Sequence, residues 1–400
     1  MNNYKIGVIG LGNVGLPLAI EFGKKYKTKG YDIDKQRINS LIEEKKLNNF
    51  SSSIPLNLSF THIIENLKTC DIYVIAVPTG LNFDKSPNLE ALITASQSVA
   101  KLLNSNDIVI YESTVFPGCT ENICVPILVG TSGLRFNLDF FVGYSPERIN
   151  TVDPVNTLTN TIKVTAGSDF DTAQIVDELY KTIIDVGTYK VSSIKVAEAS
   201  KILENAQRDV NIAFMNNAAA ILGANNISFE EVWNASSSKW NFIPFKTGLV
   251  GGECLALASH YLNHLSNQPE NILTVSRKIN EELPKNIANL VISKLNKVFP
   301  LVLNPSILIL GISYKPNTSN IKGSLVPALI DALKVSEVQI DVYDPIAEQS
   351  SICVLKELDR TKKYHLVIRA TNHLIFNAKE SDLFYNNFNC LFFDVNSMSF

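Results

Sequence analysis

A glycine-rich segment near the beginning of the chain limits the possible folds more than any other feature. Gly10-Leu11-Gly12-Asn13-Val14-Gly15 lies between a short apolar run, Lys5 to Gly10, and a helical pattern over Leu16 to Lys25. In such a turn the first glycine permits a tight bend, the second lets the backbone approach a pyrophosphate, and the third lets the helix pack on the strand. Asp32 follows at the end of the next strand, where a ribose 2′-hydroxyl would be bound. The pattern predicts a βαβ unit that binds a dinucleotide through Gly10, Gly12, Asn13, Val14, Gly15 and Asp32.

The acidic side chain of Asp32 also bears on the choice of cofactor. A carboxylate at this position disfavours a 2′-phosphate, so the sequence predicts NAD in preference to NADP. Arg37 on the following helix can bond the ribose, the pyrophosphate or solvent, and we include it among the candidate cofactor-binding residues.

Strand-like and helical patterns alternate along most of the chain, which predicts an α/β fold with doubly wound parallel sheets. The expected strands after the first βαβ unit are 71–76, 107–111 and 140–144, in a Rossmann domain over residues 1–190. Ser193 to about Asn225 contains scarcely a helix breaker and predicts one long spine helix. With a second helical stretch at 271–298, it forms an expected central helical dimerisation domain over 191–300. Alternation restarts after Pro305, which predicts a smaller α/β domain over 301–400.

Composition excludes several classes of protein. At 46% hydrophobic and 19% charged residues, 400 residues suit two or three globular domains. A formal net charge of -3 provides no basic field for a nucleic-acid backbone. The first strand begins at once and no apolar run reaches membrane-spanning length, so we expect a cytoplasmic protein with no membrane partner. Six cysteines without a CxxC pair or a His/Cys spacing predict neither a disulfide framework nor a metal site.

Further motifs follow the glycine-rich turn in a fixed order: Val77-Pro78-Thr79, Glu112-Ser113-Thr114-Val115, Tyr144 to Asn150, Lys201 to Asn205, and Lys239 to Phe242 leading into Gly251-Gly252-Glu253-Cys254. Over nearly its whole length the chain resembles the UDP-glucose/GDP-mannose dehydrogenase family, in particular the branch acting on UDP-N-acetylhexosamines. The resemblance implies an NAD-binding Rossmann domain, a central helical domain that forms a homodimer, and a C-terminal α/β domain that helps to bind the UDP-sugar. This is the layout expected from the periodicity: two Rossmann-like domains joined by a helical domain.

The resemblance also implies an activity, in which two successive hydride transfers from C6 of a UDP-sugar to NAD convert a primary alcohol to a carboxylate. An aldehyde held as a thiohemiacetal can give up a second hydride and become a thioester, which water cleaves. Cys254 would be the nucleophile, and without its motif it would be buried filler by default. Lys201 and Asn205 would aid proton removal and stabilise the oxyanion at C6. Glu147 and Thr114 would assist thioester hydrolysis.

Other residues acquire binding roles from the same resemblance. The implied cofactor site adds Pro78, Thr79, Ser113 and Thr114. The implied substrate site comprises Glu147, Arg148, Lys201, Asn205, Phe242, Phe245, Gly248, Lys315 and Arg277.

The chain departs from the family at several of these motifs. The family usually has His before the cysteine and Asp four residues after it, followed by Pro, where this chain has Glu253, Ala258 and Ser259. A carboxylate beside the thiol disfavours the thiolate, and Ala258 removes a carboxylate from the reaction centre. In the C-terminal domain Asn320 and Lys322 replace Asp and Arg, and Lys cannot reproduce the bidentate clamp that Arg gives a phosphate. Thr247 replaces a proline.

Several interpretations therefore stay open. The leading one is an NAD-dependent dehydrogenase of a UDP-N-acetylhexosamine that supplies a uronate for polysaccharide biosynthesis. One alternative is a catalytically impaired paralogue that binds NAD or the UDP-sugar as a partner or regulator, and another is a UDP-glucose 6-dehydrogenase. A two-electron hydroxyacid dehydrogenase is disfavoured by Cys254 and the second α/β domain. The sequence does not name the sugar.

Overall fold

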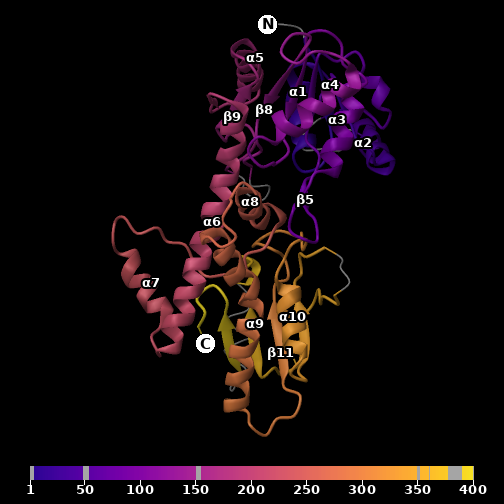
Figure 1. Ribbon diagram of the computed structural model, residues 1–400. Helices are drawn as coiled ribbons and strands as arrows, with labels where there is room; N and C mark the ends of the chain where they lie inside the picture. Colours follow the sequence, from indigo (N-terminus) through magenta and orange to yellow (C-terminus); the bar gives the residue numbers. More distant parts are fainter. Residues whose placement is uncertain are drawn as a thin grey trace. The chain divides into compact units, whose positions relative to one another are not determined.

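The computed structural model describes residues 4–47, 54–149, 155–348, 352–359, 361–376 and 390–399, without the side chains of residues 46, 47, 253 and 254 (Figure 1). The chain forms two compact units. The first comprises Met1–Glu204 with His260–Leu265, and the second comprises Asn205–Ser259 with Ser266–Phe400. The expected domain boundaries near residues 190 and 300 stay a prediction.

The first unit contains an eight-stranded sheet in the order β10-β9-β8-β7-β4-β1-β2-β3. Its strands are β1 (Lys5–Ile9), β2 (Lys27–Tyr31), β3 (Leu58–Thr61), β4 (Ile72–Ile75), β7 (Asp107–Tyr111), β8 (Phe140–Tyr144), β9 (Lys163–Gly167) and β10 (Thr188–Lys190). The strand order reverses between β1 and β4, and ligands of such sheets bind at this switch point, beyond the carboxyl ends of the strands.

One part of this sheet differs from the expected all-parallel arrangement. β9 pairs antiparallel with β8, while every other strand pair of the sheet is parallel. The described parts of the connection between β8 and β9 contain no helix, and a return without a crossover helix places the next strand antiparallel. A short antiparallel hairpin, β5 (Gly80–Leu81) with β6 (Pro87–Asn88), follows β4.

Helices cover both faces of the eight-stranded sheet, as the doubly wound prediction requires. A core cluster joins β1, β4 and β7 to α1 (Gly15–Lys25), α2 (Lys35–Leu47) and α5 (Phe170–Lys181). On the other face lie α3 (Glu90–Ala100) and α4 (Val125–Ser132), the latter preceded by a π-helical turn at Thr120–Cys124. Ser96 on α3 bonds the buried Tyr111 hydroxyl of β7 at 2.8 Å.

The predicted spine helix is present as α6 (Ile194–Ala224), within one residue of the expected bounds at each end (Figure 1). It is followed by α7 (Phe229–Ser237), α8 (Glu253–Asn263) and α9 (Ile272–Val298). Asn271 caps α9 with its side chain, and Thr274 returns a hydrogen bond to the Asn271 backbone, which completes a capping box. No helix in the described ranges is both long and apolar enough to cross a membrane.

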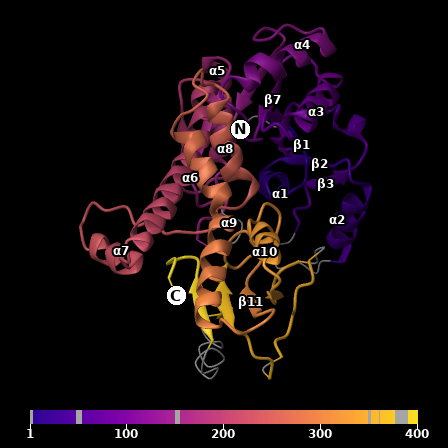
Figure 2. The same ribbon diagram turned by 60° about the horizontal axis from the view of Figure 1, so that its bottom comes forward.

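The second unit contains a four-stranded parallel sheet in the order β12-β11-β13-β14 (Figure 2). Its strands are β11 (Ser306–Leu310), β12 (Gln339–Tyr343), β13 (Leu366–Arg369) and β14 (Leu391–Asp394). Ile307 and Ile309 pack with α9 and α10 (Val326–Lys334), whereas Leu308 and Leu310 face a second core cluster. The α/β prediction with a second Rossmann-like domain is confirmed.

Candidate active site

The glycine-rich turn joins the carboxyl end of β1 to α1 in a shape that side chains would obstruct. Gly10 has φ of +87°, and a Cβ there would lie 2.8 Å from the Ala76 carbonyl oxygen. A Cβ at Gly15 would lie 1.8 Å from the Gly10 carbonyl oxygen, whereas one at Gly12 would meet nothing within 4 Å. Gly10 and Gly15 are therefore required by close packing, and Gly12 leaves open space beside the backbone. This shape fits a pyrophosphate at the beginning of α1.

Asp32 follows β2 directly and is bonded to the same turn. Its Oδ2 accepts the Leu11 backbone N–H at 2.8 Å, and its Oδ1 accepts the Asp34 N–H at 3.0 Å. Arg37 on α2 donates from Nε to the Leu11 carbonyl at 2.7 Å. The structure therefore brings the glycine turn, Asp32 and Arg37 together.

Hydrogen bonds also tie together the loops that follow β4 and β7. The Ser113 hydroxyl donates to the Val77 carbonyl at 2.6 Å, and the Thr79 hydroxyl donates to the Thr114 carbonyl at 2.6 Å. Pro78 lies between the two bonded residues of the β4 loop. Because β4 lies beside β1 in the sheet, these four predicted cofactor-binding positions lie at the same edge as the glycine turn.

Glu147, the candidate for thioester hydrolysis, lies in the loop after β8. Its Oε1 accepts the backbone N–H groups of Arg148 at 2.6 Å and of Ile149 at 2.5 Å. Its Oε2 is buried, has no hydrogen-bond partner among the described residues, and lies 3.7 Å from Nζ of Lys163. One oxygen of this carboxylate is thus fixed by the backbone, and the other is buried without a hydrogen bond.

Sequence reasoning missed the buried side chains behind Glu147. Lys163, the first residue of β9, donates from Nζ to Oε2 of Glu112 at 2.6 Å and to the Pro146 carbonyl at 3.0 Å. The Tyr180 hydroxyl on α5 donates to the other Glu112 oxygen. Burial, opposed by Lys163, raises the pKa of Glu112 to about 7. A lysine and a glutamate 51 residues apart give no local signal of such a pair.

Another ion pair joins the loop after β8 to α6. Glu204 on α6 binds the Arg148 guanidinium, with 2.7 Å from Oε1 to Nη2 and 3.4 Å from Oε2 to Nε. Both of its oxygens are thus engaged by one arginine. The side chain of Glu253 lies outside the described residues.

The candidate amine and amide lie one turn apart on α6. Lys201 belongs to the first compact unit and Asn205 to the second. Asn205 is buried, with 7% of its surface exposed, although a helix-surface position would be the default for such a polar residue. Their shared helix face agrees with the spacing of four residues.

In the second unit, Cys254 occupies the first turn of α8, and its side chain lies outside the description. The preceding glycines pack against the loop after β11. A Cβ on Gly251 would lie 2.7 Å from the Gly323 carbonyl oxygen, and one on Gly252 would lie 2.9 Å from the Tyr314 ring. Lys315 is next to this tyrosine, with Nζ 5.3 Å from the ring centroid. The structure thus places the backbone before Cys254 beside the predicted Lys315 segment.

A buried network holds Arg277, a candidate substrate ligand. Its Nη1 lies 2.6 Å from Oδ1 of the fully buried Asp209 on α6. The same oxygen accepts Nδ2 of Asn280 at 2.8 Å, and Oδ2 accepts the Ser259 hydroxyl at 2.6 Å. Ala258 is also fully buried. Arg277 therefore stabilises the packing of α6, α8 and α9 in this structure, and its substrate role stays a prediction.

The predicted sugar-binding loop between α7 and α8 is fixed largely through its backbone. Gly248 exchanges two hydrogen bonds with the Asn216 side chain, at 3.0 and 3.1 Å. Trp233 donates to the Phe245 carbonyl at 2.7 Å, and the rings of Phe242 and Phe245 pack against a cluster that includes Phe229. The Thr247 hydroxyl, where the family has proline, donates to the Val395 carbonyl at 2.9 Å.

Asn320 and Lys322, two of the residues at which the chain departs from its family, belong to one local turn. The Asn320 side chain accepts the Lys322 backbone N–H at 2.8 Å, and the Asn320 carbonyl accepts the Tyr314 N–H at 3.3 Å. Asn320 therefore orders the loop that carries Lys315, while its Oδ1 is engaged by the backbone.

Sequence models of one family match three successive parts of the chain. The NAD binding domain matches residues 4–184, the central domain 195–282, and the UDP binding domain 308–397. The chain belongs to the UDP-glucose/GDP-mannose dehydrogenase family. The resemblance predicted from the motifs is confirmed.

Individual relatives of this dehydrogenase are similar along most of its length. A UDP-N-acetyl-D-glucosamine 6-dehydrogenase of Salmonella typhi is 42% identical over 396 residues, which cover 96% of this chain and 93% of that protein. A protein of the same name from Pseudomonas aeruginosa is 42% identical over 358 residues, covering 86% and 83%. The structure of a UDP-D-ManNAc dehydrogenase from Pyrococcus horikoshii superposes with a TM-score of 0.87 at 25% identity, covering 99% and 96%.

Family membership identifies the cofactor and the substrate class. The dehydrogenase uses NAD, as predicted, and the UDP binding domain makes a UDP-sugar its substrate class. Its family and relatives perform NAD-dependent oxidation of nucleotide sugars. In the described residues no group of three His, Cys, Asp or Glu side chains could hold a metal ion.

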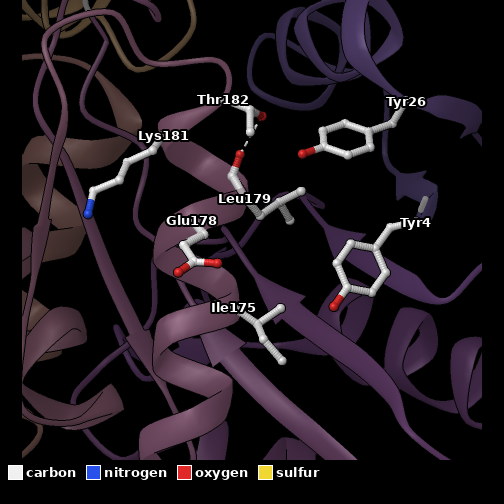
Figure 3. A pocket seen from close by; sticks show the side chains of 7 residues that line it. All are labelled: Tyr4, Tyr26, Ile175, Glu178, Leu179, Lys181 and Thr182. Atoms are coloured by element: carbon white, nitrogen blue, oxygen red, sulfur yellow. Dashed lines mark hydrogen bonds between the residues drawn. The ribbon is translucent and has the colours of Figure 1, made fainter. Parts of the chain in front are cut away.

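A cavity of about 590 Å³ lies apart from the predicted site residues of the first unit (Figure 3). It opens near the amino ends of β1 and β2, beside α5. The glycine-rich turn lies at the opposite, carboxyl end of β1. Its lining combines aliphatic side chains, two tyrosines and a polar rim: Tyr4, Tyr26, Ile175, Glu178, Leu179, Lys181 and Thr182. None of the predicted site residues is among them.

Proposed function

We propose that this dehydrogenase oxidises C6 of a UDP-N-acetylhexosamine to the carboxylate in two NAD-dependent steps through a thioester on Cys254. The 42% identity to UDP-N-acetyl-D-glucosamine 6-dehydrogenases over nearly the whole chain carries this proposal. The sugars we consider are the UDP derivatives of N-acetylglucosamine, N-acetylgalactosamine and N-acetylmannosamine, and the product would supply polysaccharide biosynthesis.

The proposed reaction balances over two oxidations and one hydrolysis. NAD, when bound, would supply the hydride acceptor for each oxidation, so each sugar would reduce two NAD molecules. Lys201 and Asn205 stabilise the oxygen of C6 as its proton leaves, and the Cys254 sulfur adds to the aldehyde carbon. After the second hydride has left, water attacks the thioester, the C–S bond breaks, and the thiol is regenerated. Glu147 takes a proton from that water, with Thr114 helping to place it.

The supporting geometry lies within each unit. Glu147 has one oxygen fixed by two backbone N–H groups and a second without a hydrogen bond, which suits a general base. The segment before Cys254 lies beside the loop of Lys315, which suits joint recognition of a UDP-sugar.

A homodimer is part of the proposal. Leu203, Phe214 and Ile221 lie along one face of α6, at intervals of eleven and seven residues, and each is more than half exposed. Large apolar side chains in such a stripe are typical of a helix–helix contact. A second copy of the chain is the partner expected on this face.

The test is the number of NADH molecules formed per UDP-sugar consumed. Purified protein is given the three UDP-N-acetylhexosamines and UDP-glucose in turn, with Cys254→Ala alongside. We expect two NADH per molecule of one N-acetylated sugar and no uronate from the variant. A preference for UDP-glucose, or a single NADH per sugar, would contradict the proposal.

The replacements at 253 and 258 favour a second candidate function, an impaired paralogue that binds its ligands without turning them over. Ala258→Asp distinguishes the two. A large gain in NADH formation identifies an enzyme limited by the missing carboxylate. NAD and UDP-sugar binding without turnover in both forms supports the impaired paralogue. Because position 258 is fully buried, a thermal melt must accompany the assay.

A further inference from the structure

We propose that His373 is a positioning residue for the UDP-sugar site, and that its imidazole holds the loop after β11 in the shape that presents Lys315 to the substrate. The inference rests on the proposed function, because it takes Lys315 as a substrate ligand. It adds a residue that acts through the backbone of the Lys315 loop.

His373 lies where two loops meet at the carboxyl edge of the second sheet. The strand order β12-β11-β13-β14 reverses between β11 and β13, and ligands of open α/β sheets bind beyond the carboxyl ends of the strands at such a point. The loop after β11 carries Lys315, and the loop after β13 carries His373. A Cβ on Gly311 would lie 2.6 Å from Cβ of Thr371, so the two loops pack closely where they leave the sheet.

Both ring nitrogens of His373 make hydrogen bonds, and the side chain is fully buried. Nδ1 lies 2.8 Å from the backbone nitrogen of Asn317, and because a backbone N–H only donates, Nδ1 is the acceptor. Nε2 lies 3.1 Å from Oδ2 of Asp344. An ionised carboxylate only accepts, so Nε2 donates. The two partners therefore select the tautomer that carries its proton on Nε2.

Asp344, which directly follows β12, holds the beginning of the same loop. Its Oδ2 also accepts the Ile312 N–H at 2.9 Å and the Ser313 hydroxyl at 3.2 Å. Burial opposes ionisation, but the hydrogen bonds from His373 and Ile312 lower the pKa of Asp344 to about 2. His373 and Asp344 together therefore fix the loop at two points, one before Lys315 and one after it.

Asn317 completes the connection between the two loops. Its Oδ1 accepts the Leu374 N–H at 2.9 Å, in the direction opposite to the bond from its own N–H to His373. Its φ is +59°, in the left-handed region that asparagine adopts more readily than most residues. Two hydrogen bonds in opposite directions restrict the shapes that the loop can take. A loop ordered before binding lowers the entropic cost of binding a ligand.

Two substitutions separate the roles of the two ring nitrogens. In asparagine, Oδ1 is as many bonds from Cα as Nδ1 is in histidine, so His373→Asn keeps an acceptor for Asn317 and loses the donor to Asp344. In glutamine, Nε2 is as many bonds from Cα as Nε2 is in histidine, so His373→Gln keeps the donor and loses the acceptor. Each variant loses one hydrogen bond.

Calorimetric titration of the full-length protein with UDP tests the inference without reference to turnover. We expect His373→Gln to bind UDP roughly tenfold more weakly than the wild type, because the loop must then be ordered on binding. His373→Asn should stay within about twofold of the wild type. Equal losses in the two variants, wild-type affinity in His373→Gln, or a wild type that does not bind UDP overturns the inference.

His365 provides a matched control in the same unit. Its Nδ1 accepts the Ser306 N–H at 3.0 Å, at the amino end of β11 and thus at the opposite edge of the sheet from Lys315. His365→Gln removes a comparable hydrogen bond and should leave UDP affinity unchanged. A loss of affinity equal to that of His373→Gln would trace both losses to general destabilisation and overturn the inference.

Kinetics supply a second measurement. In His373→Gln the KM for the UDP-sugar should rise by the same factor as the UDP dissociation constant, with kcat within about twofold of the wild type. A fall in kcat with an unchanged KM overturns the inference. If the wild type forms no NADH from any UDP-sugar, the proposed function fails, while the UDP titration still decides the inference.

Amide hydrogen exchange in the wild type guards against variants that do not fold. In protein labelled with ¹⁵N in asparagine, the Asn317 amide is identified by its loss in Asn317→Gly, since glycine tolerates the positive φ. Asn317 is exposed, so its amide exchanges slowly only if the bond to His373 persists. We expect slow exchange that UDP slows further. Exchange at the rate of an unprotected amide, or no effect of UDP, overturns the inference.

Discussion

Each of the two compact units buries an ion pair, and the pairs differ in which atoms around them lack a hydrogen bond. Lys163 and Glu112 in the first unit, and Arg277 and Asp209 in the second, both have an N–O separation of 2.6 Å. Both oxygens of Asp209 accept hydrogen bonds, from Arg277, Asn280 and Ser259. The Lys163 cluster instead reaches Glu147, one of whose oxygens has no hydrogen bond within the described structure.

The two clusters leave different kinds of atom without a hydrogen bond. Around Asp209 both carboxylate oxygens are engaged, and the unpaired atom among the described residues is Nε of Arg277, a donor 3.7 Å from Oε1 of Glu281. Around Lys163 the unpaired atom is Oε2 of Glu147, an acceptor. Buried polar atoms without a partner are uncommon, so each marks a place where a ligand or water can complete the site.

The largest effect is expected at Asp209. Asp209→Ala leaves the Arg277 guanidinium buried without its counter-charge, and we expect the free energy of unfolding to fall by about 3–5 kcal/mol. Denaturant melts measure this free energy of unfolding. Asp209→Leu combined with Arg277→Met should be more stable than Asp209→Ala. The exposed pair of Asp331 and Lys334 is the control, since Asp331→Ala should change stability by roughly 0.5 kcal/mol or less. Equal losses at both aspartates would remove the distinction.

A smaller effect on stability, which depends on pH, is expected at Glu112. The folded state raises its pKa to about 7 from the ordinary 4.5, so the folded protein binds the proton more tightly than the unfolded chain does. The contribution of Glu112 is therefore fully present below about pH 4.5 and is lost as the pH rises through 7. Relative to Glu112→Gln, the wild type should lose about 1–3 kcal/mol over this window. Denaturant melts of both proteins from pH 4 to pH 8 measure this loss. If the free energies of unfolding of the two proteins change in parallel with pH, the prediction is wrong.

The smallest effect is expected at Ser259, which supplies one hydrogen bond to the Asp209 carboxylate. Ser259→Ala should cost about 1 kcal/mol, because a buried acceptor loses its donor while Arg277 and Asn280 remain. Ser98 on α3 is the control, since its hydrogen bond to the Thr94 carbonyl is exposed to solvent. Ser98→Ala should be within roughly 0.5 kcal/mol of the wild type. A loss of several kcal/mol at Ser259 would show that the network depends on every member.

The sequence predicted what periodicity and turn chemistry determine. The glycine turn, the doubly wound first sheet, the ends of α6 and the smaller second sheet follow from local patterns. The short strands β9 and β10 were not predicted, because β9 begins with a lysine and gives a weak apolar signal. The antiparallel turn of β9 depends on tertiary pairing with β8 and was missed for the same reason.

The candidate site was predictable only where a motif marked it. Asp32 lies against the glycine turn as expected, and Cys254 begins a helix. The partners of Glu147 were invisible, since Lys163 and Tyr180 come from β9 and α5 and meet Glu112 only after the sheet has formed. The burial of Arg277 against Asp209 was also missed, because a contact 68 residues away in sequence carries no local pattern.

The close packing of Gly251 and Gly252 on Tyr314 and Gly323 restricts how this protein can change. A side chain at either glycine would strike the other loop, so the two loops must vary together. Position 253, directly after the glycines, carries glutamate. Laboratory evolution toward a new sugar should therefore yield substitutions at 251 or 252 only with a compensating change around 314 or 323.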